Sequence, residues 1–137
     1  GEDFRIEDEI LPFCAKQNLG VMAYGALSHG LLTGTMTPDT RFEDADWRGR
    51  GSSFANRLFG RNQFLRNLEK VDILKEVAAS KGKTVAQLAL AWVVSNPVVS
   101  VALVGIRHPS EIEENIGALD WAMTDVEREE IRAIVAG

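Results

Sequence analysis

The sequence predicts an α/β fold with two parallel strands, four to five helices and one long loop. Two apolar runs, Val21–Tyr24 and Val99–Val104, have the length of buried strands, and helical patterns separate them. Strands that alternate with helices indicate a parallel sheet with right-handed crossovers. Two strands do not close a sheet, and 137 residues fall short of the about 250 that a complete (β/α)8 barrel needs. We therefore expect residues 1–137 to form one partial domain, a portion of such a barrel or a half that pairs with another unit.

The first half of the chain predicts one helix, one strand and a long irregular segment. Apolar residues recur at helical spacing over Glu7–Gln17, and Gly20 suits the left-handed position that follows a helix. The short apolar run Val21–Tyr24 predicts a strand that is buried on both faces. Residues 25–62 lose this periodicity and are rich in Gly, Thr, Pro, Asp, Arg and Ser. Loops of that length are usually functional or mobile.

Two helices follow the irregular segment. The first is predicted over Gln63–Ser80, where leucines and valines form one apolar stripe. The second, Val85–Asn96, is apolar on nearly every side, so we expect it to be deeply buried. Thr84 and Gln87 have the spacing of a capping box at its start, and Pro97 prevents it from continuing.

After the second strand the pattern predicts two more helices, Pro109–Leu119 and about Asp125–Val135. A proline at the first helical turn costs no hydrogen bond, so Pro109 favours a helix start there. Thr124 and Glu127 have the spacing of a second capping box. The predicted order is therefore helix, strand, long loop, two helices, strand and two helices.

Composition excludes several classes of function. The net charge of −5 and the lack of a basic stripe argue against nucleic-acid binding. No apolar run is long enough to cross a membrane, and we find no signal peptide. The single cysteine, Cys14, excludes an internal disulfide and is expected to be a small apolar residue on a helix face. We expect a cytoplasmic protein.

The segment that joins the second strand to its following helix has the features of an anion site. Gly105 lets the backbone approach a ligand, and the helix from Pro109 offers N–H groups and a favourable dipole. Arg107 adds a charged fork that suits a phosphate group. A solvated loop arginine is the alternative interpretation of the same residues.

Two segments of the chain resemble the aldo-keto reductases. Residues 23–34, Ala-Tyr-Gly-Ala-Leu-Ser-His-Gly-Leu-Leu-Thr-Gly, are similar to the family's Tyr-Ser-Pro-Leu-x-x-Gly-Leu-Leu-Thr-Gly segment. Residues 105–118 are similar to its cofactor segment, Gly-x-Arg-x-Pro-x-Gln-x-x-Glu-Asn-x-Gly-Ala. The runs 39–42, 46–48 and 86–92 also fit, and 5–13 resembles the helix before the seventh barrel strand. The resemblance covers essentially the whole chain and implies the C-terminal half of a TIM (β/α)8 barrel.

The resemblance implies that the chain binds NADP(H). Tyr24 would stack on the nicotinamide, and Arg107, which follows Gly105, would hold the adenosine 2′-phosphate. Loop 25–62 would serve cofactor and substrate, and its residues near the pyrophosphate would be Gly25, Ala26, Leu27, Ser28, Gly30 and Arg41. Residues of the last cofactor segment would lie near the adenosine: Glu111, Glu114 and Asn115.

Several positions depart from the family pattern. Gly25 replaces the usual serine, and Ala26 replaces the usual proline. Thr35 stands where many members have lysine, and Glu111 stands where glutamine is common. A carboxylate close to a phosphate repels it unless Arg107 intervenes. The choice between NADP and NAD is therefore left open by the sequence.

The family's chemistry is the NADPH-dependent reduction of aldehydes and ketones to alcohols, with tyrosine, lysine, aspartate and histidine assisting. Those four residues belong to the first half of the barrel, and the sole tyrosine here is already assigned to stacking. His29 and His108 are expected to be exposed loop residues. We therefore assign no catalytic residue and expect this chain alone to be inactive.

Three interpretations of the chain remain. It could supply the cofactor-binding half of a reductase that also needs the N-terminal barrel half and a small carbonyl substrate. It could be a non-catalytic NADP(H)-binding module, similar to family members that serve as channel β-subunits. It could also be a ligand-free half-barrel that self-associates through its open sheet edges.

Overall fold

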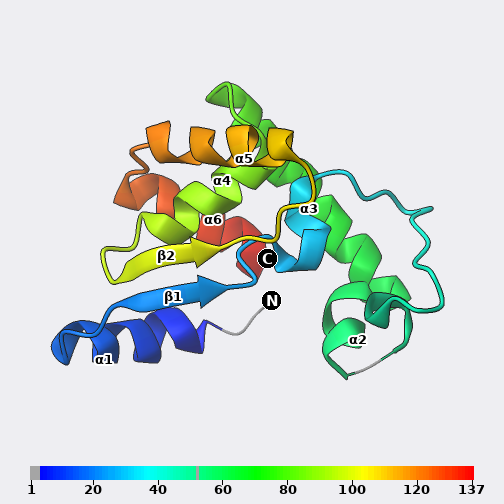
Figure 1. Cartoon of the computed structure of the whole chain (residues 1–137), viewed down its shortest axis with the longest axis horizontal. Helices are drawn as coiled ribbons and strands as arrows, with labels where there is room; N and C mark the ends of the chain where they lie inside the picture. Colours follow the sequence, from blue (N-terminus) through cyan, green and yellow to red (C-terminus); the bar gives the residue numbers. More distant parts are fainter. Residues whose placement is uncertain (1–3, 52) are drawn as a thin grey trace.

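The computed structural model describes residues 4–51 and 53–137, and its centre is a short parallel sheet (Figure 1). Strand β1 (Val21–Tyr24) pairs with β2 (Val99–Leu103), and Tyr24 lies opposite Leu103 in the register. Within the described residues the sheet has two strands. The parallel pairing confirms the predicted fold class, because the chain between the strands crosses over through helices.

Helices account for most of the remaining chain. The α-helices are α1 (Leu11–Lys16), α2 (Ser53–Phe59), α3 (Arg61–Ser80), α4 (Val85–Val94), α5 (Pro109–Ile116) and α6 (Asp125–Ala136). A π-helical turn, η1 (Ile6–Ile10), precedes α1. Short 3-10 turns are η2 (Ser28–Thr33), η3 (Trp47–Gly49) and η4 (Gly117–Asp120). Among the described residues, no helix is both long and apolar enough to span a membrane.

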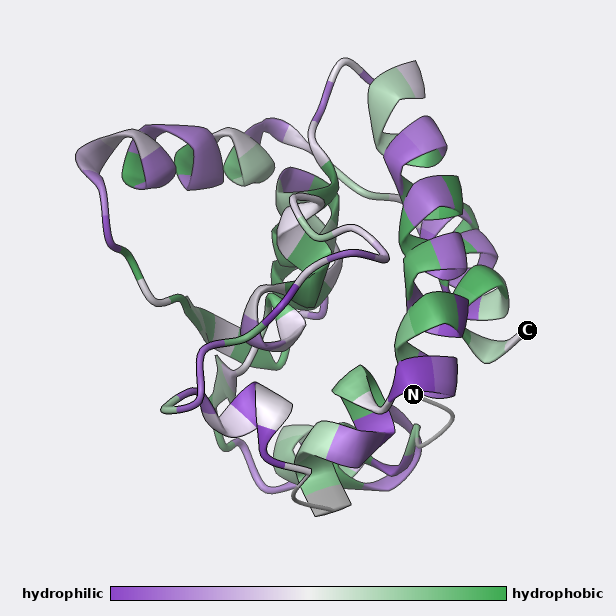
Figure 2. Cartoon of the chain, turned by 90° about the vertical axis from the view of Figure 1, so that its right-hand side faces the viewer, coloured by the Kyte–Doolittle hydropathy of each residue, from purple (hydrophilic) through white to green (hydrophobic). Residues whose placement is uncertain are grey.

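Helix α4 lies at the centre of the packed layer, as its apolar composition predicts. It contacts β2 on one side and α3 and α5 on others. Its buried residues are Val85, Ala86, Leu88, Ala89, Leu90 and Ala91. Leu88 belongs to a core cluster with Leu74 of α3 and Ile131 of α6. This cluster packs the three helices into one layer. Figure 2 shows α3 with hydrophobic and hydrophilic faces, as expected for a helix that is half in this layer.

The predicted starts of α4 and α6 are confirmed by their hydrogen bonds, whereas α4 ends at Val94 and α5 at Ile116, before the predicted Asn96 and Leu119. The Thr84 hydroxyl accepts from the Gln87 backbone N–H at 3.2 Å. The Thr124 hydroxyl accepts from the Glu127 backbone N–H at the same distance. Both capping boxes are complete, and Pro109 lies in the first turn of α5. These local signals place three helix starts without help from the tertiary fold.

The prediction that β1 is buried on both faces is wrong. Met22 is 65% exposed and Tyr24 is 81% exposed, whereas Val21 and Ala23 between them are half-buried. On the neighbouring strand, Leu103 is 41% exposed. The helices cover one face of the sheet, so a continuous apolar run here marks a strand whose second face has no partner in the described residues.

The prediction that residues 25–62 form one irregular loop is also wrong in part. Helix α2 lies within it, together with the turns η2 and η3. Ala55 and Phe59 of α2 are buried, and Phe59 shares a core cluster with Leu31, Phe64 and Leu68. The burial of Phe59 therefore stabilises a helix that the sequence analysis did not predict, because the surrounding residues are rich in glycine and arginine.

Candidate functional site

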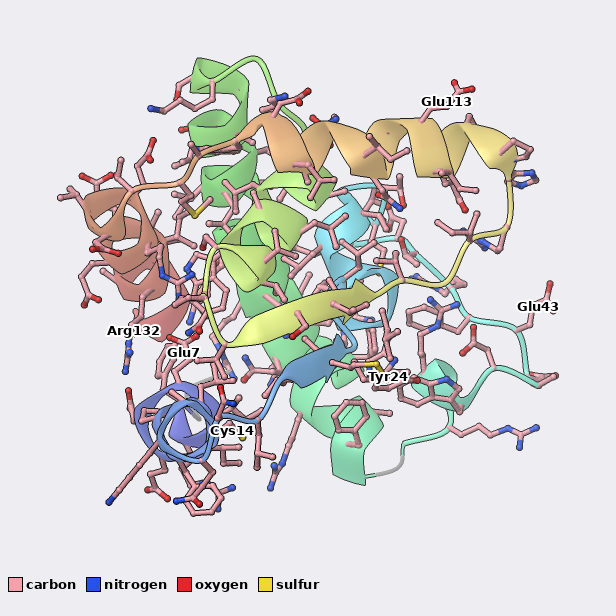
Figure 3. All side chains as sticks on the ribbon, turned by 60° about the vertical axis from the view of Figure 1, so that its left-hand side comes forward. Glu7, Cys14, Tyr24, Glu43, Glu113 and Arg132 are labelled. Carbon is pink, nitrogen blue, oxygen red and sulfur yellow. The ribbon has the colours of Figure 1, made fainter. Side chains whose placement is uncertain are left out.

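The loops that follow β1 and β2 leave the sheet at the same end, because the strands are parallel. In parallel α/β folds, ligands bind at the carboxyl ends of the strands. Figure 3 shows Tyr24 at this end of β1, with its ring outside the packed layer. Residues 25–34 follow β1, and residues 105–115 follow β2 as a short loop and most of α5. The two predicted ligand segments therefore flank one end of the sheet.

The turn after β1 has an unusual backbone. Four of its residues have positive φ, at 75° for Gly25, 47° for Ser28, 56° for His29 and 96° for Gly30. Two glycines adopt this conformation easily, but a serine and a histidine do so at a cost. Internal bonds hold the turn: Ser28 N–H donates to Gly25 O at 2.8 Å, and Gly30 N–H donates to Leu27 O at 3.0 Å. Strained backbone of this kind clusters at functional sites.

The side chains of this first segment point in different directions. Ala26 is buried in a cluster with Leu90, Ala91 and Ala118, and Leu27 packs against it. Any contact that Ala26 and Leu27 make with a ligand would therefore use the backbone. The Tyr24 ring, by contrast, is largely exposed and lies edge to face with the His29 ring, with the ring centroids 6.0 Å apart.

An aromatic cluster next to Tyr24 was missed by the sequence analysis. His29 is half-buried rather than exposed, with ring centroids 5.0 Å from Trp47 and 5.1 Å from Phe54. Trp47 stacks on Phe54 at 5.7 Å. The signal that could have found it is the recurrence of aromatic residues every five to seven positions, at 42, 47, 54, 59 and 64. These packed rings form an apolar aromatic surface next to the exposed Tyr24 ring.

An ion pair fastens the middle of the long segment to this turn. The Arg48 guanidinium binds both carboxylate oxygens of Asp46, with Nη2 at 2.5 Å from Oδ2, and donates through Nη1 to His29 O at 3.1 Å. It also lies over the Phe42 ring at 4.7 Å. Hydrogen bonds from Arg48 lower the pKa of the Asp46 carboxyl, so the pair stays ionised at neutral pH. The hydrogen bond from Arg48 to His29 O thus stabilises the strained turn from a separate part of the chain.

The second segment contains the anion-site candidates. Gly105 is exposed, and a Cβ there would meet no other atom within 4 Å, so its backbone is open to a ligand. The Arg107 side chain is 83% exposed. Glu111 Oε2 accepts from the backbone N–H groups of Arg107 at 2.6 Å and His108 at 3.3 Å. These bonds lower the pKa of the Glu111 carboxyl, and its Oε1 lies 3.9 Å from Arg107 Nη2.

The remaining predicted residues are Glu114, Asn115 and Arg41. Glu114 is exposed on α5, and its Oε1 accepts from the Thr84 hydroxyl at 2.8 Å. Asn115 is half-buried on the same helix. Arg41 is exposed in the long segment, where Nη1 donates to Thr40 O at 3.3 Å. Glu111, Glu114 and Asn115 are therefore grouped on α5, whereas Arg41 belongs to a separate loop.

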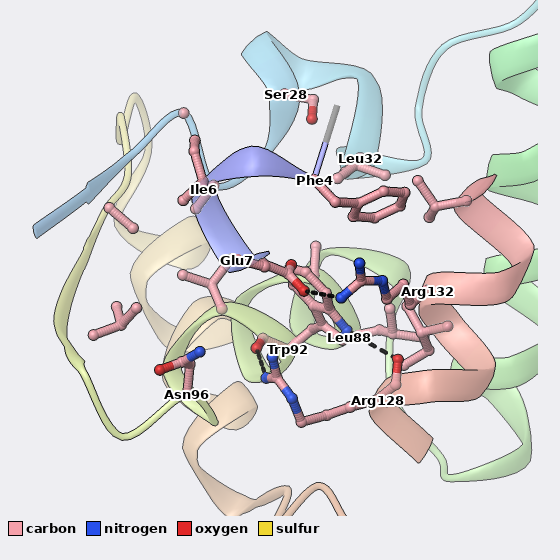
Figure 4. Close-up of a pocket in the computed structure, with 18 of the residues that line it drawn as sticks. Phe4, Ile6, Glu7, Ser28, Leu32, Leu88, Trp92, Asn96, Arg128 and Arg132 are labelled. Atoms are coloured by element: carbon pink, nitrogen blue, oxygen red, sulfur yellow. Dashed lines mark hydrogen bonds and ion pairs between the residues drawn. The ribbon is translucent and has the colours of Figure 1, made fainter. Parts of the chain in front are cut away.

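A cavity of about 640 Å³ lies along the covered face of β1, between η1, α3, α4 and α6 (Figure 4). Two of its charged residues form an ion pair, Arg132 with Glu7 at 3.4 Å. Arg128 and Lys70 instead donate to the backbone carbonyls of Trp92 and Val135, each at 2.7 Å. Burial raises the pKa of the Glu7 carboxyl. The remaining lining is mostly apolar, and among residues 4–51 and 53–137 no group of His, Cys, Asp and Glu could hold a metal ion.

Comparison with known proteins decides what this arrangement is. Residues 3–136 match the Aldo/keto reductase family. The chain belongs to this family. It is 30% identical over 130 residues to the aldo-keto reductase YhdN of Bacillus subtilis, covering 95% of this chain and 38% of that protein. It is 35% identical over 121 residues to a probable voltage-gated potassium channel subunit beta of Arabidopsis thaliana, covering 85% of this chain and 34% of that one.

A solved structure of the family shows which part of the fold is present. The chain superposes on the glycerol dehydrogenase AKR11B4 from Gluconobacter oxydans with a TM-score of 0.84 and 35% identity, covering 96% of this chain and 38% of that one. The fold is therefore that of a partial (β/α)8 barrel. The chain spans little more than a third of the length of these aldo-keto reductase relatives.

The residues present fit a nicotinamide dinucleotide. An exposed aromatic ring, an accessible glycine backbone and an exposed guanidinium are groups that suit a nicotinamide, a pyrophosphate and a phosphate. All three are found at the carboxyl end of the sheet: Tyr24 as the last residue of β1, and Gly105 and Arg107 on the loop after β2. Glu111 is the exception, because its ionised carboxylate disfavours a second anion beside Arg107.

Proposed function

We propose that the chain is the cofactor-binding half of an aldo-keto reductase that uses NADPH to reduce aldehydes and ketones to alcohols. The observation that carries the proposal is the position of the two cofactor-like segments, which follow paired parallel strands at one end of the sheet. That end is where (β/α)8 enzymes bind their ligands. Family membership supports an oxidoreductase, and the geometry supports the cofactor role.

Each residue would act through a simple interaction. Tyr24 would stack on the nicotinamide with its exposed ring, which buries a large area at little entropic cost. Arg107 would pair with the 2′-phosphate. The backbone of residues 25–30 and Gly105 would approach the pyrophosphate, and Arg41 would close over it. Glu114 and Asn115 would recognise the adenine edge, the carboxylate as acceptor and the amide as both donor and acceptor.

This chain would bind and orient the cofactor without completing the reaction. The bound cofactor supplies hydride, and a protein group must supply the proton that forms the alcohol. In the sequence Tyr24 is the sole tyrosine, and it is assigned to stacking. We therefore propose that catalytic activity and the site for the small carbonyl substrate both need the N-terminal half of a barrel. We also propose that the protein is cytoplasmic.

The exposed apolar side chains support a partner at the sheet. Met22, Tyr24, Val101 and Leu103 are exposed on the strands, and Ile112 and Ile116 are exposed on α5. Additional barrel strands and helices would cover these positions and satisfy the open sheet edges. Self-association of this chain through the same edges is the competing proposal, and it needs no cofactor.

A non-catalytic NADP(H)-binding module is the second candidate function. It is favoured by the 35% identity to the Arabidopsis protein, whose name is that of a probable potassium channel subunit. The two candidates share the cofactor site and differ in turnover. Cofactor binding by the complete protein without carbonyl reduction would favour the module.

Tryptophan-fluorescence titration of this chain with NADPH and NADH tests the cofactor site. We expect saturable quenching by NADPH, and we expect Arg107→Ala to weaken NADPH far more than NADH. Arg66→Ala on α3, which changes an exposed arginine away from the site, is the matched control. Equal losses for both cofactors would contradict the 2′-phosphate assignment. If the folded parent chain shows no quenching with either cofactor and self-associates in sedimentation experiments, the ligand-free half-barrel is favoured.

A further inference from the structure

Thr84 connects the start of α4 to the side chain of Glu114 on α5. Its hydroxyl accepts from the Gln87 backbone N–H at 3.2 Å, which caps α4. The same hydroxyl donates its proton to Glu114 Oε1 at 2.8 Å. The two residues are 30 positions apart in the sequence, so this bond joins separate helices. One side chain therefore both begins a helix and fixes a carboxylate on the next.

Gln87 adds a second connection between the same helices. Its Oε1 accepts from Thr84 N–H at 3.0 Å, and its Nε2 donates to Glu114 O at 2.8 Å. The amide lies so close to Gly117 that a Cβ at that glycine would overlap Gln87 Nε2. Gly117 is thus needed for this approach. The two capping-box residues of α4 therefore hydrogen-bond to both the side chain and the backbone carbonyl of Glu114.

An exposed glutamate on a helix ordinarily moves among many rotamers, and fixing it costs conformational entropy. Glu113 on the same helix projects away from the molecule (Figure 3). Glu114 differs, because the Thr84 hydroxyl holds one carboxylate oxygen in place before any ligand arrives. A pre-fixed acceptor binds a donor more tightly because less freedom is lost on binding.

The chemistry of a carboxylate selects the ligand group that it meets. An ionised carboxylate accepts hydrogen bonds and donates none. The 6-amino group of adenine is the donor on that base edge, and hypoxanthine carries a carbonyl oxygen in its place. We infer that Thr84 and Gln87 are positioning residues that hold Glu114 for the adenine 6-amino group. This inference rests on the proposed function, in which α5 receives the adenosine half of the cofactor.

The test compares binding of NADPH with binding of its hypoxanthine analogue, deamino-NADPH, by tryptophan-fluorescence titration. We expect the parent chain to prefer NADPH. Thr84→Val removes the donor and the cap together, whereas Thr84→Asp keeps an N-cap acceptor and cannot donate to Glu114. We expect both variants to reduce the preference about threefold to tenfold, as for one hydrogen bond to a charged group. Thr84→Ser, which retains the hydroxyl, should keep it.

The outcomes separate this inference from the proposed function. A purely structural role for Thr84 would lower stability in thermal melts and weaken both dinucleotides equally, and that result overturns the inference alone. An equal preference in parent, Thr84→Asp and Thr84→Ser also overturns it. A parent chain that binds neither dinucleotide overturns the proposed function together with the inference. Glu113→Gln is the matched control, and it should leave the preference unchanged.

Discussion

The helical layer and the two-stranded sheet bury similar apolar residues to very different extents. Leu88 of α4 packs between residues of α3 and α6 and is almost fully buried. Leu103 of β2 and Met22 of β1 keep a large part of their surface exposed. The helices find their partners within this chain, whereas the outer face of the sheet finds none among residues 4–51 and 53–137.

This difference separates the part of the molecule that provides most of the buried core from the part that we propose for cofactor recognition. Stability scales with apolar area removed from water, so the layer of α3, α4 and α6 should dominate the free energy of unfolding. The sheet and the loops at its carboxyl end contain the exposed rings, the strained turn and the exposed Arg107. Substitutions in the two regions should therefore affect different measurements.

The largest effect should come from a cavity in the helical layer. We expect Leu88→Ala to lower the free energy of unfolding by about 3 kcal/mol, because the methyl groups removed leave a hole that the three helices cannot fill. Leu119→Ala is the matched control: that leucine is 71% exposed, and its loss should cost roughly 0.5 kcal/mol or less. Urea titrations of both variants measure the difference. Equal losses would show that the layer is not the stable part.

The helical layer is also the part that the sequence predicts well. Helices α4 and α6 begin at capping boxes, α3 carries one apolar stripe and α4 is apolar on nearly every side, so residues a few positions apart are enough to specify them. The parallel sheet follows from the alternation of strands and helices. In each case the decisive interactions are local or repeat at a fixed period.

The open end of the sheet was predicted less well because its structure depends on distant contacts. Periodicity could not show that Met22 and Tyr24 would be exposed. In this sequence, a strand that is covered on one face has the same continuous apolar pattern as a strand that is covered on both. The rings that meet His29 come from two places in the long segment, Trp47 and Phe54. Gly105 and Arg107 were found from the strand-turn-helix pattern and the other candidate residues from a resemblance, and the ligand contacts of all of them stay predictions.

The second largest effect should appear at the open end and leave the layer untouched. We expect Glu111→Gln to increase the ratio of NADPH affinity to NADH affinity about tenfold, because a negative charge 3.9 Å from Arg107 is removed. Glutamine still caps α5, so thermal stability should change little. Parallel fluorescence titrations with both cofactors give the ratio. An unchanged ratio would mean that the carboxylate does not act on the 2′-phosphate.

A smaller effect on stability should come from a helix start in the layer. The Thr124 hydroxyl caps α6, which carries the buried Ile131. We expect Thr124→Ala to cost about 1 kcal/mol of unfolding free energy, and Thr124→Ser to cost much less because the hydroxyl remains. Cofactor binding should be the same in both variants if the two regions act separately. A loss of binding that follows the loss of stability would show that they are coupled.

The smallest effect should be a pH dependence that belongs to the helical layer. A hydrogen bond from Lys81, at 2.6 Å, and further bonds from Thr124 lower the pKa of Glu127 from 4.5 to about 2. A carboxyl whose pKa is lowered by folding stabilises the folded state above its unfolded pKa. That contribution is therefore complete above pH 4.5 and is lost as the pH falls toward 2.

The Glu127→Gln variant isolates this contribution from other groups, among them Glu7, whose raised pKa acts in the opposite direction. Glutamine keeps the capping box but does not titrate. Between pH 5 and about pH 2, the free energy of unfolding should fall less steeply in the variant than in the parent. Identical slopes would mean that Lys81 and Glu127 do not pair in solution. A steeper fall in the parent, with unchanged relative affinities for NADPH and NADH at neutral pH, would assign the pH response to the helices and leave recognition to the sheet.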